Sequence, residues 1–341
     1  MRKINDSALA LGLTAVIVML IYLSSEAKAG AETGISLCEG VIIPALLPVL
    51  MISNILLTSR ASRFFERLCG GVFRHLLKLP ESAVTPVLFG LVAGYPSGAV
   101  LTLEQYKAGA LSDEEAGRMM RFNLCGGAAF IITAVGNGYY GSTKIGTLLY
   151  LISLTSNMMI ALFSAFLFRG AVHRSERRRA LPFSDALCRS AETASRSVIL
   201  MSAYIILFCA LVRIAKPPPF LTPVLEITSG IFTAGSKIPL PFCAAFLSFG
   251  GICIHLQLIG MLSEMKVKYA EFFLFRVLAA VLSYGMGKLY LLFFPDAVAV
   301  FSALSDEVTV RFTEAHTALG VLAMLGCAML VIEIENRKIR L

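Results

Sequence analysis

The stretch 83–103, AVTPVLFGLVAGYPSGAVLTL, is apolar almost throughout and is interrupted in its middle by Gly94-Tyr95-Pro96-Ser97-Gly98. Its length matches the roughly 20 residues that a helix needs to cross a bilayer core. Proline removes a backbone donor and glycine loosens a helix, while broken backbone at membrane depth survives only where protein or a water-filled cavity satisfies it. The stretch therefore predicts a re-entrant hairpin with its tip at 94–98. A proline-kinked spanning helix is the alternative.

The composition of the whole chain agrees with a membrane location. Of 341 residues, 57% are hydrophobic and 15% are charged, and the mean hydropathy is +0.78. Soluble proteins carry about a quarter charged residues. The net charge of +8 lies in short loops between apolar runs, a pattern that marks cytoplasmic loops and argues against a nucleic-acid partner.

Apolar runs predict an all-α polytopic membrane protein with about eight transmembrane helices plus re-entrant or broken helices. An N-terminal run after Arg2 and Lys3 resembles a signal peptide, but the many later spans favour an uncleaved first helix. The remaining runs fall at 35–57, 83–103, 122–140, 145–168, 197–214, 224–262, 270–294 and 317–333.

Loop charges predict the orientation. The segments 60–78 and 169–179 and the C-terminus are basic, whereas 295–316 is acidic, which places both termini in the cytoplasm if 83–103 does not cross. The amphipathic segment 60–78 is predicted to lie on the inner membrane surface, with partner binding as the alternative.

Two halves of the chain carry similar features in the same order. Leu50-Met51 matches Leu200-Met201, and glycine-broken segments follow in both halves, at Gly94–Gly98 and Gly250-Gly251. The predicted units are an N-terminal helix with a short outer loop (1–34), a first repeat (35–168), a basic cytoplasmic linker (169–196), a second repeat (197–294) and an outer loop with a last helix (295–341). The predicted topology makes the repeats inverted, as in many secondary transporters. Strict inversion requires a second hairpin within 221–262, and whether this segment spans or re-enters stays open.

Polar residues inside apolar runs are candidates for the functional site. Glu226 is interpreted as a ligand for a substrate amine or hydroxyl, or as a proton-exchanging group, with an interfacial carboxylate as the alternative. His255 and Gln257 follow the second break, where a helix-to-helix hydrogen bond is the alternative. Ser97 stands at the first break, and Asn123 begins the run at 122–140 as a packing or functional residue.

No pattern of catalysis stands out. The chain has no nucleophile–base pair, phosphate-binding loop or metal-ligand spacing, and its eight cysteines are scattered without a C-x-x-C pair. We therefore expect neither an enzyme, nor a cofactor, nor a metal site.

Three motifs resemble the sporulation integral membrane protein YlbJ family, over roughly 35–295. They are Gly94-Tyr95-Pro96-Ser97-Gly98-Ala99, Leu225-Glu226-Ile227-Thr228-Ser229-Gly230 and the run from Phe249 to Gln257. The resemblance implies a nucleoside-recognition or gate domain related to concentrative nucleoside transporters. It also implies transport of dipicolinic acid across the outer forespore membrane of a sporulating bacterium. The substrate-binding residues would come from the motifs: Ser97, Gly98, Glu226, Thr228, Gly250, Gly251, His255 and Gln257. Lys237 would serve as a nearby cation.

The sequence departs from the family pattern in two places. Asn123-Leu124-Cys125-Gly126-Gly127-Ala128 replaces an Asn-rich Gly-Pro stretch, and Cys253 replaces a serine before the His-x-Gln. Expected partners are the lipid bilayer, a small solute, a second copy or other sporulation membrane proteins. Two alternative functions remain: a transporter of nucleosides or other metabolites, and a membrane scaffold that recruits partners through 60–78 and 169–196.

Overall fold

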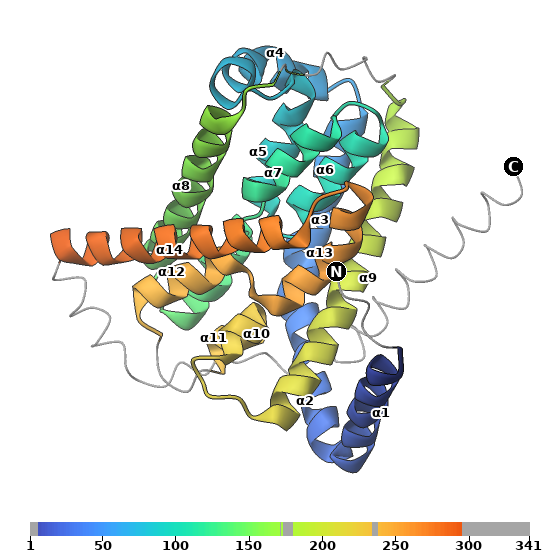
Figure 1. Cartoon of the computed structure of the whole chain (residues 1–341), viewed down its shortest axis with the longest axis vertical. Helices are drawn as coiled ribbons and strands as arrows, with labels where there is room; N and C mark the ends of the chain where they lie inside the picture. The colour runs from blue at the N-terminus through green and yellow to red at the C-terminus, as the bar shows by residue number, and fades with distance from the viewer. Residues whose placement is uncertain (1–5, 171, 173–179, 234–237, 295–341) are drawn as a thin grey trace, which may run out of the picture.

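The computed structural model describes residues 6–170, 172, 180–233 and 238–294, and every regular element in this part of the chain is helical (Figure 1). The first half contains α1 (Asp6–Tyr22), α2 (Ser24–Leu37), η1 (Cys38–Ile42), α3 (Ile43–Thr58), α4 (Ser62–Val72), η2 (Phe73–Leu77), η3 (Glu81–Ala83), α5 (Val84–Ala93), α6 (Ser97–Lys107), α7 (Asp113–Phe122), η4 (Phe130–Tyr139) and α8 (Thr143–Leu167). The second half contains α9 (Phe183–Ala215), α10 (Thr222–Leu225), α11 (Ile227–Phe232), α12 (Leu240–Phe249), α13 (Gly251–Glu264) and α14 (Tyr269–Phe293).

Five helical segments among the described residues are long and apolar enough to cross a membrane: Ser24–Thr58, Thr143–Leu167, Phe183–Ala215, Leu240–Glu264 and Tyr269–Phe293. A bent pair, Ser62–Leu77 with Glu81–Ala93, raises the number to six if it forms one span. The chain is thus an all-α polytopic membrane protein, as predicted. The expected number of about eight is not confirmed, and the predicted helix at 317–333 lies outside the described residues.

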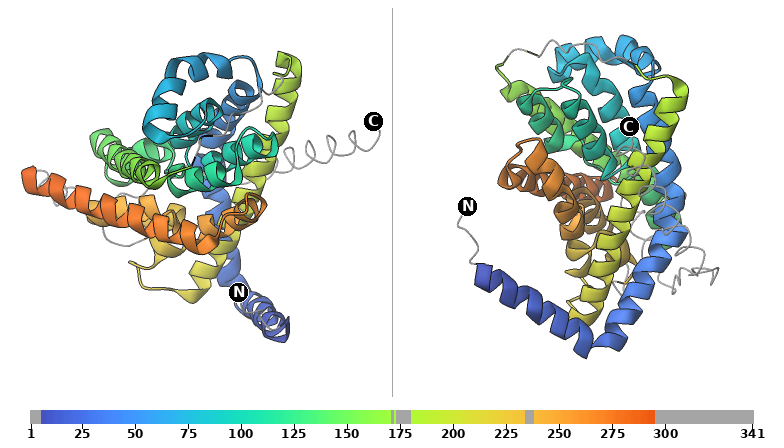
Figure 2. Two further views of the ribbon diagram at one scale, coloured as in Figure 1. Left: turned by 45° about the horizontal axis from the view of Figure 1, so that its top comes forward. Right: turned by 90° about the vertical axis from the view of Figure 1, so that its right-hand side faces the viewer.

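The longest elements form an antiparallel pair. The continuous helix α2–η1–α3 lies alongside α9, as Figure 2 shows most clearly in its right-hand view. Gly30 and Gly34 allow this approach, because a β carbon on Gly30 would lie 2.6 Å from the Cys209 carbonyl oxygen and one on Gly34 would lie 2.7 Å from the Ile206 Cα. Small residues spaced by four let two helices in a membrane pack backbone to backbone.

Two predicted connecting segments are helical. Residues 24–34, predicted as part of an outer loop, form the start of the continuous α2–α3 helix, and residues 183–196 of the predicted linker belong to α9. Both segments are rich in alanine and serine. Their moderate helix propensity is sufficient where they extend an already formed helix, since adding a residue costs much less than nucleation.

The predicted span 122–140 does not exist. Helix α7 begins at a capping box formed by Ser112 and Glu115 and ends at Phe122. Irregular backbone follows over 123–127, and the ten residues of η4 then pack on α8. The Gly126-Gly127 pair interrupts the helix that the apolar character of this run suggested.

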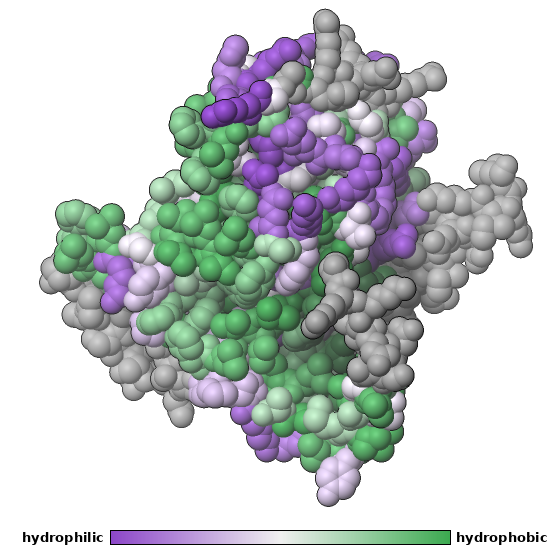
Figure 3. All heavy atoms as spheres, viewed as in Figure 1, coloured by the Kyte–Doolittle hydropathy of each residue, from purple (hydrophilic) through white to green (hydrophobic). Residues whose placement is uncertain are grey.

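The amphipathic segment at 60–78 is helical as α4 and η2, at the end of the molecule that lies opposite to α1 (Figure 1). Phe64 and Leu68 leave 65% and 68% of their surface exposed beside Arg60, Arg63 and Arg67. Apolar surface covers the middle of the face shown in Figure 3, and polar residues gather above it. This distribution fits a helix that lies at a membrane surface.

Candidate functional site at two hairpin tips

The first hairpin is formed by α5 and α6, which lie side by side (Figure 1). The chain reverses at Gly94-Tyr95-Pro96, where Gly94 has φ +89° and the Tyr95–Pro96 peptide bond is cis. Gly90 and Gly98 face each other across the hairpin, and a β carbon on Gly90 would lie 2.6 Å from the Gly98 Cα. The predicted hairpin tip at 94–98 is therefore confirmed, and the kinked spanning helix is excluded.

The tip of this hairpin packs on the irregular segment 123–127. The Tyr95 amide donates to the Cys125 carbonyl over 2.8 Å, and a β carbon on Gly94 would overlap the Gly127 amide. The Asn123 side-chain amide donates to the carbonyls of Pro86 (3.1 Å) and Gly98 (3.2 Å). Asn123 is fully buried and thus joins the hairpin to the break, which supports its structural interpretation.

A second, much shorter hairpin is formed by α10 and α11. The chain reverses at Glu226, and a β carbon on Gly230 would lie 2.6 Å from the Pro223 Cα. The Glu226 carboxylate is fully buried and accepts hydrogen bonds from the Thr228 amide (2.9 Å), the Ser229 amide and the Ser229 hydroxyl. Glu226 is therefore the buried N-cap of α11.

The second hairpin packs on a glycine break in the same way as the first. Gly250 and Gly251 have φ of +91° and +74°, a conformation that favours glycine. A β carbon on Gly251 would lie 3.2 Å from the Ile227 amide. Each half of the chain thus contains a hairpin whose tip contacts a glycine-containing break.

This arrangement corrects the correspondence proposed from the sequence. The counterpart of Gly94–Gly98 is the tip at 225–230, and the counterpart of Gly250-Gly251 is the break at 123–127. The reason is that the chain reverses at 226 but runs on through 250–251, where α12 and α13 together form one candidate span. The segment 221–262 accordingly contains both a hairpin and a span.

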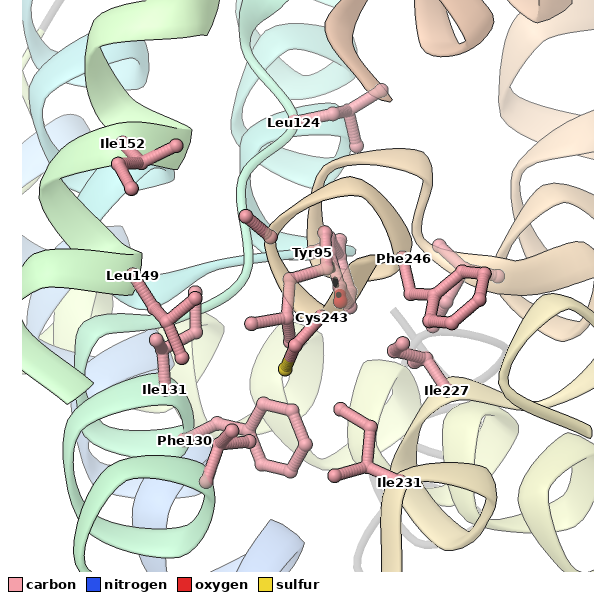
Figure 4. Close-up of a cluster of buried hydrophobic side chains, with 14 of the residues drawn as sticks. Tyr95, Leu124, Phe130, Ile131, Leu149, Ile152, Ile227, Ile231, Cys243 and Phe246 are labelled. Atoms are coloured by element: carbon pink, nitrogen blue, oxygen red, sulfur yellow. Dashed lines mark hydrogen bonds between the residues drawn. The ribbon is translucent and has the colours of Figure 1, made fainter. Parts of the chain in front are cut away.

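Tyr95 lies where the two halves meet. Its hydroxyl donates to the Leu247 carbonyl over 3.4 Å, and its ring would lie 3.7 Å from a β carbon on Gly250. Figure 4 shows Tyr95 between Phe130 and Ile131 of the first half and Ile227 and Phe246 of the second. Tyr95 belongs to the first motif, but its role as a contact between the halves was not predicted.

A closed cavity lies beside Tyr95, between the hairpin tips and the long helix pair. Its volume is about 20 Å³, which is room for about one water molecule. The walls are mainly apolar and come from η1, α3, α9 and α13 as well as both tips: Val41, Ile42, Ala45, Leu46, Tyr95, Gly127, Phe130, Met201, Ile205, Thr228 and Ile254. The structure therefore shows a meeting point with no space for a solute in this conformation.

The predicted site residues divide into two groups. Thr228 lines the cavity, while Gly98, Glu226, Gly250 and Gly251 build the tips and breaks around it. Ser97 is fully buried just after the first tip, and its hydroxyl has no hydrogen-bond partner among the described residues.

His255 and Gln257 are separated by the helix that carries them. The imidazole of His255 bonds the Tyr269 hydroxyl (3.2 Å) and the Phe249 carbonyl (3.1 Å), as the helix-to-helix alternative predicted. Gln257 donates to the Cys253 sulfur over 3.4 Å. Because α13 is regular over both residues, they point to different neighbours and do not form one site.

A buried arginine supports the first break and was not found from the sequence. Arg276 of α14 donates to the carbonyls of Leu124 (2.6 Å) and Arg121 and to the Asn157 side-chain oxygen (3.1 Å). It is only 2% exposed. The signal was present, because Arg276 is a charged residue within the apolar run 270–294, where charge is expensive and marks function.

Serine hydroxyls connect the same helices next to this arginine. Ser248 of α12 lies 2.7 Å from Ser283 of α14 and 3.1 Å from Ser153 of α8, and Ser283 donates to Ser156 over 2.8 Å. All four are buried. Such bonds hold membrane helices together, and here they attach the second half to the first.

Two further features of the described residues are their potential metal ligands and their ion pairs. No group of three or more potential ligands is placed to hold a metal ion there, and none of their ion pairs includes Glu226. Lys237, the cation proposed next to Glu226, lies outside the described residues. What the geometry offers is a pair of hairpin tips that close on glycine breaks.

These features define a polytopic all-α membrane protein built around two apposed hairpins. The chain is 26% identical to the sporulation integral membrane protein YlbJ of Bacillus subtilis (strain 168) over 336 aligned residues, which cover 82% of this chain and 81% of that protein. This similarity supports the YlbJ family, as the three motifs predicted. No family model matches the chain, and no solved structure matches it.

Proposed function

We propose that this protein is a membrane carrier for a small polar or anionic metabolite, with the meeting point of the two hairpin tips as the passage. The observation that carries the proposal is the repeated contact between a hairpin tip and a glycine break, with Tyr95 touching both halves. Broken helices that meet near the middle of two repeats are the usual place of a substrate site in secondary transporters.

The closed cavity favours a carrier that alternates between conformations. A space of about 20 Å³ admits no metabolite, so passage requires the tips to separate. The α10–α11 hairpin is the smaller of the two, because its helices have four and six residues.

Dipicolinic acid is the specific solute that we propose, carried into the developing spore compartment across the outer forespore membrane. Support comes from the motifs and from the similarity to a sporulation membrane protein. A dianion would not use the amides at the start of α11, because Glu226 already accepts from them. Recognition of its charge therefore has to come from cations elsewhere along the passage.

The test is solute flux from proteoliposomes. Vesicles that contain the protein and labelled dipicolinate are compared with protein-free vesicles loaded with the same solute. A second comparison uses protein-containing vesicles loaded with a labelled nucleoside. Faster release of dipicolinate through the protein is the expected result. Release of the nucleoside alone would show that the protein is a carrier with a different substrate. Release of neither solute would contradict the carrier function and favour the scaffold function.

The glycine contacts supply a matched pair of variants for this assay. A β carbon on Gly98 would overlap the Asn123 carbonyl oxygen, whereas one on Gly260 meets nothing within 4 Å. Gly98→Ala is expected to abolish flux, and Gly260→Ala is expected to keep it. Equal flux through both variants would contradict a passage at the first tip.

A further inference from the structure

A cleft with two cations opens at the end of the molecule opposite to α4. It lies between the start of the α2–α3 span, the end of α9 and the α10–α11 hairpin, and its volume is about 350 Å³. Arg213 and Lys216 stand on one side, and the hydroxyls of Thr33, Thr222, Ser229 and Thr233 line the rest of the cleft. The cleft is thus much larger than the closed cavity, and its two cations are the groups that can bind an anion, because the four hydroxyls already donate within the protein.

One carboxylate of the protein lies against both cations. Arg213 Nε donates to Glu26 Oε2 over 2.8 Å, and Lys216 Nζ lies 3.6 Å from Glu26 Oε1. The Glu26 side chain is 34% exposed, while those of Arg213 and Lys216 are 59% and 71% exposed. A single carboxylate against two accessible cations leaves this end of the cleft with positive charge, and it shows that both cations can hold one carboxylate together.

The floor of this cleft belongs to the second hairpin. Ser229 lines the cleft, and its hydroxyl donates to the Glu226 carboxylate at the hairpin tip. Thr228, the next residue along the chain, lines the closed cavity. The short α11 helix is therefore the partition between the cleft and the cavity.

We propose that this cleft is a binding site for a carboxylate-bearing anion, in which Arg213 and Lys216 bind the solute and Glu26 is the internal carboxylate with which the solute competes. The proposal rests on the carrier function proposed above and names its substrate class and outer binding site. Release of Glu26 frees both cations for the solute. The bound anion then lies across α11 from the cavity.

Equilibrium binding to the purified protein tests this site without any transport. The probes are dipicolinate and its neutral analogue pyridine-2,6-dicarboxamide, at low salt because exposed charge interactions are screened. Arg213→Gln and Lys216→Gln are each expected to weaken dipicolinate binding about two- to fivefold, the size of a partly exposed charge interaction. Glu26→Gln is expected to tighten it by a similar factor, since the competing carboxylate is gone. None of the three should change dicarboxamide binding.

The opposite signs separate a binding role from a structural one. All three substitutions break the same ion-pair cluster, so a purely structural role predicts that each weakens binding and lowers the melting temperature alike. Arg213→Lys retains the charge and is expected to retain most of the affinity. Lys28→Gln, on the exposed outer side of the same helix α2, serves as the control and should bind as the wild type.

Three results would overturn the proposal: the same sign for Glu26→Gln and Arg213→Gln, equal effects on both probes, or no binding of dipicolinate to the wild-type protein. If dipicolinate does not bind but a neutral solute is transported, the carrier function stands and only the anion site is contradicted. If dipicolinate binds but no solute is transported, the anion site stands and the carrier function is contradicted.

Discussion

Gly98 lies directly against the backbone of Asn123, so closely that a β carbon on Gly98 would overlap the Asn123 carbonyl oxygen. The two residues belong to the hairpin and to the break on which its tip packs. The Asn123 side-chain amide returns the contact by donating to the Gly98 carbonyl over 3.2 Å. The first hairpin is therefore positioned by contact between backbones, which is possible because Gly98 has no β carbon.

Gly98→Ala is expected to destabilise the protein, because neither backbone segment has room to yield. Overpacking of a buried site costs about 1–3 kcal/mol, and backbone against backbone belongs at the upper end. The measurement is the melting temperature of the detergent-solubilised protein, with Gly260→Ala as the control for adding a methyl group to a helix. A Gly98→Ala protein as stable as this control would contradict the close contact.

Arg276→Gln is expected to cause a large loss of folded protein. The shorter side chain leaves the buried carbonyls of Arg121 and Leu124 without their donor, at about 1–3 kcal/mol for each unsatisfied group. Arg276→Lys should not restore stability, since an ammonium group lacks the planar fork that reaches several acceptors. Size-exclusion profiles report the folded fraction.

The control for this prediction is Lys288→Gln on the same helix α14, where the side chain is exposed. It should give a profile like that of the wild type. A folded Arg276→Gln protein would show that the break at 123–127 holds its shape without α14.

Glu226→Ala is expected to lower stability by about 0.5–2 kcal/mol, because α11 loses its N-cap. Flux should fall in the same protein, since the tip at 225–230 is then poorly ordered. Glu32→Ala, which removes an exposed carboxylate on α2, is the control. Lost flux with an unchanged melting temperature would instead assign Glu226 a direct role with the solute or a proton.

His255→Phe is expected to keep solute flux, although the residue belongs to the third motif. Its ring contacts Phe249, Phe272 and Phe273, which a phenyl ring can also pack against, and its bonds go to Tyr269 and the Phe249 carbonyl. Some loss of thermal stability should accompany the lost hydrogen bonds. A stable His255→Phe protein without flux would show that His255 takes part in solute binding or transport.

Composition and local sequence predicted the elements that depend on local physics. The apolar runs located α8, α9 and α14, and the Gly-Tyr-Pro-Ser-Gly interruption located the first hairpin tip, because proline and glycine act on the backbone where they stand. The motif at 225–230 marked the second tip, although its hairpin was not recognised. A four-residue helix followed by a six-residue helix gives no periodic signal.

Long-range relationships were not available from the sequence. The contact of Arg276 with the carbonyls of Arg121 and Leu124 joins residues about 150 positions apart, and the pairing of each tip with its break is likewise tertiary. Hydropathy also failed over 122–140, because it reports how apolar a run is and not whether its helix is interrupted. Glu26, which was predicted to lie in an outer loop, meets Arg213 and Lys216 only because α2 pairs with α9.

The most direct test of the passage adds one thiol to its wall. Thr228→Cys is reconstituted into dipicolinate-loaded vesicles and treated with a bulky maleimide, with the wild-type protein treated in the same way to account for the native cysteines. Thr228 is 4% exposed and lines the closed cavity, so the reagent reaches it only when the tips separate. We expect the engineered thiol to be labelled and flux to stop after labelling, while the treated wild type keeps its flux. A thiol that is never labelled, or flux that continues after full labelling, would contradict a passage between the hairpin tips.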